Sequence, residues 1–279
     1  YDPDSPEGIK ETLEEARKNN LKVSIAGKRH SMGGHTFYDD AVVLDMTSFN
    51  KILSINPDDK TVTVQSGATW KDVIEAVHKH KLAVEVMQAY NIFSIGGSMS
   101  VNVHDSDAGR GQMIETIKSF IFLLANGTVL NVNRTENQEL FGLVMGGYGL
   151  FGVILDADLE LTDDVIYKKK EYIIDYKDYY KFYTQLRNDQ NIKVIFARLS
   201  IIPDETLLRE LIVTTYELAN ESDEDYFELA PVTKTGLKKF IFGLSRKYDF
   251  AVVPNICPSR YMAHIGILHD AANGFEVVR

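Results

Sequence analysis

Alternating apolar and polar positions predict a series of short strands along the first part of the chain. Residues 41–45 (AVVLD) and 61–65 (TVTVQ) show this alternation most clearly. The turn residues 57–60 (PDDK) and the dipeptide Asn126-Gly127 are typical of hairpins and each separates two such segments. The strands predicted in this way cover residues 21–26, 41–45, 52–56, 61–65, 83–86, 114–124, 128–132 and 153–161.

Apolar residues three or four positions apart predict helices between these strands. Ile9, Leu13 and Ala16 form one apolar stripe, and Ser5 followed by Pro6 is a typical helix start. The predicted helices cover residues 6–18, 70–80 with Thr69 as the N-cap, and 139–144. Together the elements predict an α+β fold with a mixed sheet, and the P-loop and Rossmann fingerprints do not occur in the sequence.

The character of the sequence changes after residue 163. Asp163-Asp164 and the lysine run 168–170 predict a charged boundary. Beyond it, the pattern predicts a helix at 176–187, strands at 193–201 and 211–216, and a solvated acidic loop at 221–228. We therefore expect two domains, residues 1–163 and 164–279.

Composition and charge exclude several classes of protein. The chain has 279 residues, of which 44% are hydrophobic, so it can bury a sizeable core. A net charge of −10 argues against a nucleic-acid-binding protein. One cysteine, Cys257, excludes an internal disulfide and fits a reducing, cytoplasmic location, with membrane association and export left open. No apolar run is long enough to span a bilayer, and the histidines lack the spacing of metal ligands.

Two glycine-rich stretches carry the candidate chemistry. In residues 23–37 (VSIAGKRHSMGGHTF), a predicted strand runs into Gly27, Lys28 and Arg29. Free backbone N–H groups in such a loop suit an anion such as phosphate, and the basic pair adds positive charge. The alternative is an ordinary glycine-rich loop with a solvated basic pair.

The second stretch covers residues 94–111 (SIGGSMSVNVHDSDAGRG). Met99, Val101 and Val103 alternate with small polar residues and His104, which predicts a strand with one polar face. That face would suit the close approach of a large polar ligand. The alternative is a strand whose polar face is only exposed to solvent.

These stretches, with three further segments, resemble a known family. The segments are GKRHS (27–31), VTVQSGATW (62–70), IGGSMSVNVH (95–104), LANGTVL (124–130) and GGYGLFGVI (146–154). In this order they resemble the FAD-binding domain of the vanillyl-alcohol oxidase/p-cresol methylhydroxylase (PCMH) family, in its sugar-acting branch of aldonolactone and alditol oxidases and decaprenylphosphoryl-ribose oxidase. The resemblance covers residues 5–162. It implies a PCMH-type FAD-binding domain of two α/β subdomains, followed by part of an α+β substrate (cap) domain.

The resemblance also implies which residues bind FAD. The first loop would bind the pyrophosphate, and His30 occupies the position of a histidine that many members bond covalently to the flavin. His35 is a weaker candidate for that bond. His104 would lie nearest the reactive end, although Asp105 stands where the family usually has glycine. The implied cofactor ligands are Ala26, Gly27, Lys28, Arg29, His30, Ser31, Met32, Ser66, Gly67, Gly96, Gly97, Ser98, Ser100, Val101, His104, Gly152, Val153 and Ile154.

The implied reaction is hydride transfer from a hydroxyl-bearing carbon to flavin N5, with a base removing the hydroxyl proton. The substrate class would be a sugar, an alditol, a lactone or a prenyl-linked sugar. No residue stands out as the base, and Arg198, Tyr216 and His264 are weak candidates. Family chains are longer, so we expect the rest of the cap domain beyond Arg279.

The electron acceptor stays open between oxygen and another carrier. In the aldonolactone branch, a residue larger than glycine just before the histidine hinders oxygen. Val103 at that position therefore favours a dehydrogenase, or it is only a buried strand residue. An oxidase that releases hydrogen peroxide and a non-catalytic FAD-binding protein are the alternative functions.

Overall fold

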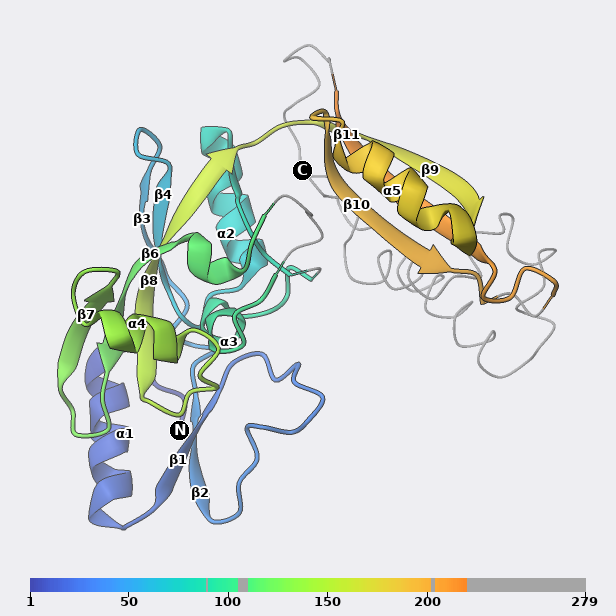
Figure 1. The fold of residues 1–279 in the computed structure, drawn as a ribbon. Coiled ribbons are helices and arrows are strands. Elements are labelled where there is room, and N and C mark those ends of the chain that lie inside the picture. The colour runs from blue at the N-terminus through green and yellow to red at the C-terminus, as the bar shows by residue number, and fades with distance from the viewer. Residues whose placement is uncertain (89, 105–109, 202–203, 220–279) are drawn as a thin grey trace. The chain divides into compact units, whose positions relative to one another are not determined.

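The computed structural model describes residues 1–88, 90–104, 110–201 and 204–219. The described residues up to Asp164 form one compact unit, and those from Val165 onward form a second (Figure 1). The assignment of an FAD-binding domain to residues 1–163 and a substrate domain to 164–279 stays a prediction. Asp105, the acidic segment 221–228, Cys257 and His264 lie outside the described residues.

The first unit begins with a helix and a parallel pair of strands. Helix α1 (Pro6–Lys18) starts at Ser5, whose Oγ accepts a hydrogen bond of 3.3 Å from the Gly8 amide, as the sequence predicts. Strands β1 (Lys22–Ala26) and β2 (Ala41–Asp45) pair in parallel. The apolar stripe of α1 packs in a small core with Leu44.

A six-stranded antiparallel sheet forms the rest of this unit. Its order is β3-β4-β8-β6-β7, with β5 paired to the far end of β8. The strands are β3 (Ile52–Asn56), β4 (Thr61–Gln65), β5 (Leu82–Val84), β6 (Ile117–Leu123), β7 (Val129–Asn133) and β8 (Val153–Asp163). The α+β class is confirmed, but the strands do not form one mixed sheet, because the parallel pairing is confined to β1 and β2.

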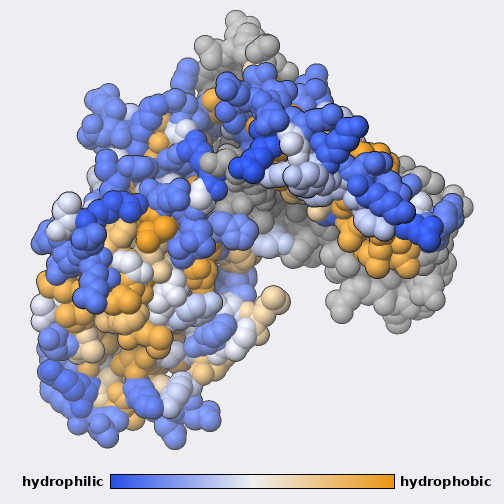
Figure 2. Space-filling model, in the orientation of Figure 1, coloured by the Kyte–Doolittle hydropathy of each residue, from blue (hydrophilic) through white to orange (hydrophobic). Residues whose placement is uncertain are grey.

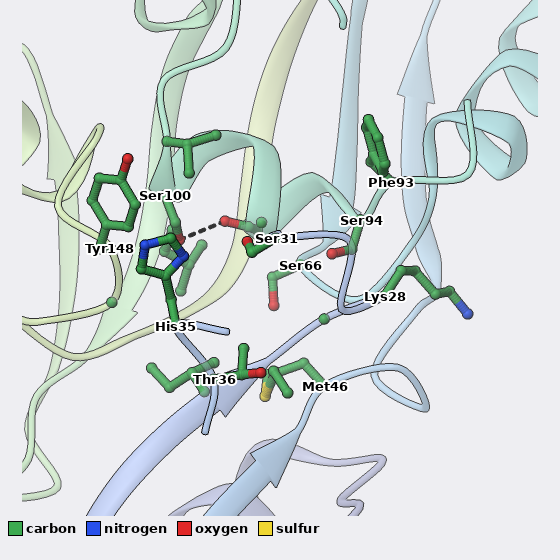
Figure 3. Close-up of a pocket in the computed structure, with 18 of the residues that line it drawn as sticks. Lys28, Ser31, His35, Thr36, Met46, Ser66, Phe93, Ser94, Ser100 and Tyr148 are labelled. Carbon is green, nitrogen blue, oxygen red and sulfur yellow. Dashed lines mark hydrogen bonds between the residues drawn. The ribbon is translucent and has the colours of Figure 1, made fainter. Parts of the chain in front are cut away.

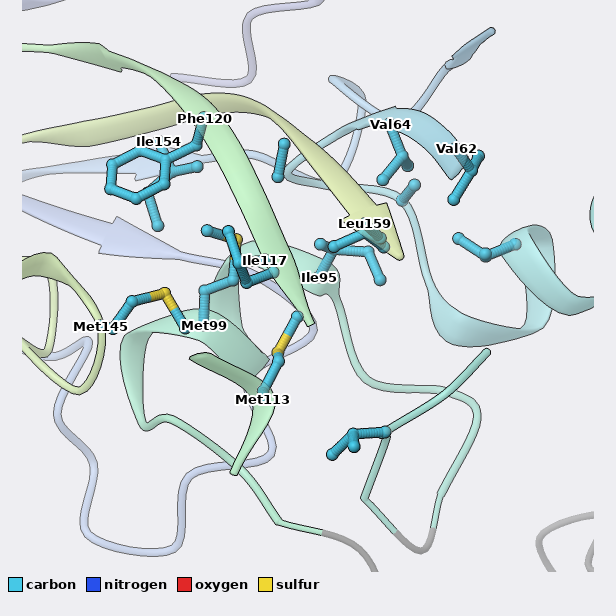
Figure 4. Packing of buried hydrophobic residues seen from close by; sticks show 14 of the residues in the cluster. Val62, Val64, Ile95, Met99, Met113, Ile117, Phe120, Met145, Ile154 and Leu159 are labelled. Carbon is cyan, nitrogen blue, oxygen red and sulfur yellow. The ribbon is translucent and has the colours of Figure 1, made fainter. Parts of the chain in front are cut away.

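Short helices connect these strands and cover the sheet. They are α2 (Trp70–Val77), α3 (Ile95–Ser100) and α4 (Gln138–Val144), with the 3-10 turns η1 (His78–His80) and η2 (Met113–Glu115). Thr69 caps α2 in a reciprocal capping box with Asp72. The main core gathers side chains from the sheet and from α3, among them Phe120, Ile117, Leu159, Met99 and Ile95 (Figure 4). This core holds α3 against the sheet.

The predicted strand through residues 99–104 is wrong. Residues 95–100 form helix α3, and a turn follows. Ile95 and Met99 are four residues apart and both fully buried. Residues at this spacing lie on the same face of a helix, so the helix buries both of them together. The Ser100 hydroxyl donates to the Gly96 carbonyl at 2.7 Å, and Ser98 Oγ lies 3.0 Å from the Ser94 carbonyl oxygen. These local bonds satisfy the small polar residues inside the helix, where the sequence pattern had placed them along a strand.

The second unit is a three-stranded antiparallel sheet with one helix. Its order is β10-β11-β9, and the elements are β9 (Tyr167–Asp175), η3 (Tyr176–Asp178), α5 (Tyr179–Arg187), β10 (Ile192–Leu199) and β11 (Glu210–Leu218). Leu186 of α5 packs with Val213 and Ile195 of the sheet. The sequence did not predict β9. Its lysines read as a boundary, but Lys170 forms an ion pair with Glu217 on the neighbouring strand.

Candidate functional site

A cavity of about 280 Å³ lies within the first unit, where β1 ends beside the N-terminus of α3 (Figure 3). The loop after β1 forms one wall, and the segment before β8 forms another. Of the predicted cofactor ligands, the lining includes Ala26, Gly27, Lys28, Arg29, His30, Ser31, Ser66, Gly96, Gly97, Ser100, Val101, Gly152 and Ile154. The structure therefore brings together residues from segments far apart in the sequence. Their role as FAD ligands stays a prediction.

The loop after β1 presents unpaired backbone N–H groups. β1 ends at Ala26, whose carbonyl accepts a hydrogen bond of 2.8 Å from the Met46 amide. Within the described part of the chain, no acceptor is recorded for the amides of residues 27–31. Arg29 has a φ of 56°, in the left-handed region, so the chain curls at this point. A curled run of free amides is a concave site for an anion.

The Arg29 side chain is held to the strand beside it. Its Nη2 lies 2.6 Å from Asp45 Oδ2, while Oδ1 of the same carboxylate accepts bonds from the Thr47 hydroxyl and amide at 2.7 and 3.0 Å. Partial burial opposes ionisation of Asp45, but the Thr47 bonds and the charges of Arg29 and Lys28 outweigh it and lower the pKa of the carboxyl. At neutral pH the ion pair therefore anchors the loop at Asp45.

Glycines allow the cavity walls to approach each other. A β-carbon at Gly27 would lie 2.1 Å from Ser94 Oγ, and one at Gly96 would lie 2.8 Å from the Ser66 β-carbon. Gly152 has a φ of 150°, and a β-carbon there would lie 2.4 Å from the Leu123 carbonyl oxygen. A side chain at position 96 or 152 would overlap atoms that are held in place, and one at position 27 would displace the Ser94 hydroxyl. The cavity shape therefore depends on the same glycines that define the sequence motifs.

One hydroxyl in this cavity has no partner. Ser66 is 4% exposed, and its Oγ is buried without a hydrogen bond in the described structure. Ser66 lines the cavity and is drawn beside Ser94 in Figure 3. A buried hydroxyl is normally satisfied, so an unpaired one at a cavity wall suits a polar ligand atom.

The opposite wall is apolar and opens to the surface. Tyr148, Leu150 and Phe151 line the cavity, yet they are 57%, 83% and 38% exposed. Figure 2 shows apolar residues gathered on the visible face of the first unit around α4, which precedes this segment. A polar loop facing an apolar wall suits an elongated ligand with both a charged group and a flat ring.

Two histidines lie against aromatic rings at the cavity. The ring centroids of His30 and Phe93 are 4.6 Å apart, edge to face, and those of His35 and Tyr148 are 5.3 Å apart. Sequence reasoning missed Gln88, Phe93 and Ser94 as lining residues. Ser94 lies two residues before the glycine pair Gly96-Gly97 and could have been found, whereas Gln88 and Phe93 carry no motif signal.

Several predicted site residues do not line the cavity. Met32 is fully exposed, and Val153 is buried in the core beside α1. Ser98 is buried and bonded to Trp70 Nε1, while His104 pairs with Gln112 in an isolated bridge. Gly67 fits tightly against the chain, because a β-carbon there would lie 1.7 Å from the Met46 carbonyl oxygen. Arg198 and Tyr216, the weak candidates for the base, belong to β10 and β11 of the second unit.

The described part of the chain contains neither a cluster of metal-ligating side chains nor a helix suited to cross a membrane. No group of three or more His, Cys, Asp or Glu side chains there could hold a metal ion. None of its helices combines the length and the apolar character that crossing a bilayer requires.

Comparison with known sequences finds one matching domain family and several similar proteins. Residues 1–133 match the family described as FAD binding domain. An uncharacterized oxidoreductase, ORF5 in the fasciation locus of Rhodococcoides fascians, is 31% identical over 155 residues, which are 55% of this chain and 35% of that protein. The L-gulonolactone oxidase of Bos taurus is 29% identical over 164 residues, with 57% and 36% covered. The decaprenylphosphoryl-beta-D-ribose oxidase of Mycolicibacterium smegmatis is 29% identical over 160 residues, with 56% and 35% covered.

The matched part of this chain thus spans about a third of the length of these relatives. Among solved structures, an alkyldihydroxyacetonephosphate synthase superposes with a TM-score of 0.68 at 14% identity, covering 78% of this chain and 46% of that one. At that identity the likeness concerns the fold, and it confirms the expected PCMH-type architecture.

Proposed function

Because the first unit of this chain belongs to the FAD-binding domains of the vanillyl-alcohol oxidase/p-cresol methylhydroxylase type, we propose that the protein is an FAD-dependent oxidoreductase. Its substrate carries a hydroxyl on a carbon of a sugar, an alditol, a lactone or a prenyl-linked sugar. Bound FAD supplies the hydride acceptor for that carbon. The sugar-acting relatives support this substrate class.

The free amides of residues 27–31 are the observation that carries the proposal. FAD contains a pyrophosphate, and a curled run of unpaired N–H groups beside Lys28 is suited to bind it. The Ser66 hydroxyl supplies a further polar contact for the bound dinucleotide. The apolar wall of Tyr148, Leu150 and Phe151 suits the adenine ring. The cavity therefore fits both the charged and the flat parts of FAD.

His30 is the proposed attachment point for a covalent bond to the flavin. It lies on the cavity wall, in the loop after β1, with its ring against Phe93. A covalent bond would hold the cofactor and raise its reduction potential, which favours hydride transfer from an alcohol. His35 lines the same cavity but contacts Tyr148, and it is the weaker candidate.

The proposal for the electron acceptor rests on the size of one side chain, Val103. Val103 is half-buried and packs against the main core. We propose a dehydrogenase that passes its electrons to a carrier other than oxygen, on the size of this side chain. Steady-state rates with oxygen and with an artificial acceptor test this point, and a fast release of hydrogen peroxide would contradict it.

The single cysteine supports a cytoplasmic location.

The test of the proposed function is the absorption spectrum of the purified protein, followed by acid precipitation. We expect flavin absorption, with the yellow colour in the pellet for the unaltered protein and in the supernatant for His30→Ala. Flavin in the supernatant in both cases would leave FAD binding intact and contradict the covalent bond. Protein that neither carries nor takes up FAD would contradict the proposed function. Flavin that no sugar or alditol bleaches would favour a non-catalytic FAD-binding protein.

A further inference from the structure

The amide of Gln88 is held in one orientation by a buried tryptophan. Trp70 is 1% exposed, and its Nε1 lies 2.9 Å from Gln88 Oε1 and 3.0 Å from Ser98 Oγ. An indole N–H can only donate, so the Gln88 atom that faces it must be the oxygen. Ser98 Oγ lies 2.8 Å from the same oxygen. Both contacts fix Oε1 toward the interior of the unit.

This orientation leaves the amide nitrogen as the free end of the side chain. Gln88 is half-buried and lines the cavity. Among the described residues, no acceptor is recorded for its Nε2. A glutamine amide has two N–H donors on this atom, and a cavity wall is where a ligand can accept from them.

The surroundings of Gln88 place it beside the aromatic wall of the cavity. The Trp70 amide donates to the Phe93 carbonyl at 3.1 Å, so Trp70 contacts both Phe93 and Gln88. The Phe93 ring in turn contacts the His30 ring. The Gln88 amide and the rings of Phe93 and His30 thus lie on one wall of the cavity, which Trp70 contacts from the interior. Because its support is buried, the amide is oriented before a ligand arrives.

We propose that Gln88 is a further cofactor-binding residue, which donates a hydrogen bond from Nε2 to an oxygen or nitrogen acceptor of FAD. This inference rests on the proposed function, since it concerns the same cavity. Trp70 and Ser98 act as positioning residues, because they hold the amide and do not themselves reach the cofactor. The acceptor is either a carbonyl or ring nitrogen of the flavin or a hydroxyl of the chain that links the ring to the pyrophosphate.

Gln88→Glu is the variant that isolates the donor. A glutamate keeps an oxygen for Trp70 and Ser98, replaces the donor nitrogen by an acceptor oxygen and adds a negative charge. Gln138→Glu adds the same charge at an exposed position of α4 and is the matched control. FAD is titrated into the flavin-free proteins in a His30→Ala background, so that a covalent bond does not mask a change in affinity. Flavin fluorescence reports binding, and the emission of Trp70, the single tryptophan of the chain, reports whether the wall is intact.

We expect Gln88→Glu to weaken FAD binding by about tenfold or more, since the hydrogen bond is lost and a charged oxygen then faces the acceptor of FAD. Gln138→Glu should bind like its parent, and the Trp70 emission of flavin-free Gln88→Glu should be unchanged. A shift of the visible flavin band would assign the acceptor to the ring, and an unshifted band would assign it to the linking chain. FAD affinity within twofold of the parent would overturn the inference. A parent protein that does not bind FAD would instead overturn the proposed function.

Discussion

Gly67 lies so close to Met46 that a β-carbon at position 67 would be 1.7 Å from the Met46 carbonyl oxygen. The Gly67 amide also donates to the Phe49 carbonyl at 2.8 Å, so the backbone is fixed on both sides. This glycine belongs to a motif that suggested a cofactor contact, but it does not line the cavity. Its role in the structure is to let two backbone segments pack together.

Gly67→Ala should therefore destabilise the protein severely, by about 3 kcal/mol or more, because the methyl group meets backbone that cannot move aside. Gly142→Ala is the matched control, since nothing lies within 4 Å of its β-carbon position inside α4. It should stabilise by roughly 0.5–1 kcal/mol. Urea unfolding of both variants checks the prediction, and similar midpoints would contradict it.

Ser66→Ala should have opposite effects on stability and on cofactor binding. In the flavin-free protein the variant removes a buried hydroxyl without a partner, so the free energy of unfolding should rise by about 1 kcal/mol. FAD affinity should fall by about tenfold, because the contact to the ligand is lost. Ser54→Ala, at an exposed hydroxyl outside the cavity, should leave FAD affinity unchanged. Unchanged FAD affinity in Ser66→Ala would show that this hydroxyl does not contact the cofactor.

Asp156 should make the stability fall as the pH rises. Burial, with a smaller effect of the Asp158 charge, raises the pKa of Asp156 from 3.8 to about 6. The folded protein then holds this proton more tightly than the unfolded chain. Stability contributed by Asp156 is therefore present below about pH 4 and is lost as the pH rises through about 6.

Asp156→Asn should remove this loss. At pH 7.5 it should raise the free energy of unfolding by roughly 1 kcal/mol, a value reduced for the partial exposure of the group. The gain should vanish near pH 4. Asp58→Asn, in an exposed turn, removes the same charge and should show no such dependence. Equal effects of Asp156→Asn at both pH values would contradict the prediction.

Asp45 should affect the pH dependence of stability in the opposite direction to Asp156. Its pKa is lowered, so its ion pair with Arg29 and its bonds from Thr47 stabilise the protein above about pH 4 and are lost as the pH falls through the lowered value. Asp45→Asn should lower the free energy of unfolding by roughly 1 kcal/mol at pH 7. At the acidic end of a pH series the difference should disappear. A constant difference across the series would contradict this assignment.

Much of the fold could be predicted from local patterns. Capping residues fixed the starts of α1 and α2, because Ser5 and Thr69 satisfy free helix amides through short-range contacts. The antiparallel order β4-β8-β6 could not be predicted, since it joins segments far apart in the chain. Helix α3 was missed because alternating residues in so short a segment fit one helical turn as well as a strand.

Some residues of the site could likewise be predicted from the sequence, and others could not. Gly27, Gly96 and Gly152 could be found because each carries a motif, and in the structure each lies close to a neighbouring segment of the chain. Gln88 could not be found, since its role depends on the indole of Trp70, eighteen residues away in the sequence. The engagement of Arg29 by Asp45 was also not predictable, because it requires β1 and β2 to pair in parallel.

The central claim is that the free amides of residues 27–31 bind the pyrophosphate of FAD. Competition binding in the His30→Ala variant, in which no covalent bond holds the flavin, tests it most directly. FAD is bound to the flavin-free variant, and ADP or riboflavin is then added. ADP carries the pyrophosphate without the flavin, and riboflavin carries the flavin without phosphate. The account predicts a one-to-one FAD complex that ADP displaces and riboflavin does not. Displacement by riboflavin but not by ADP would contradict it.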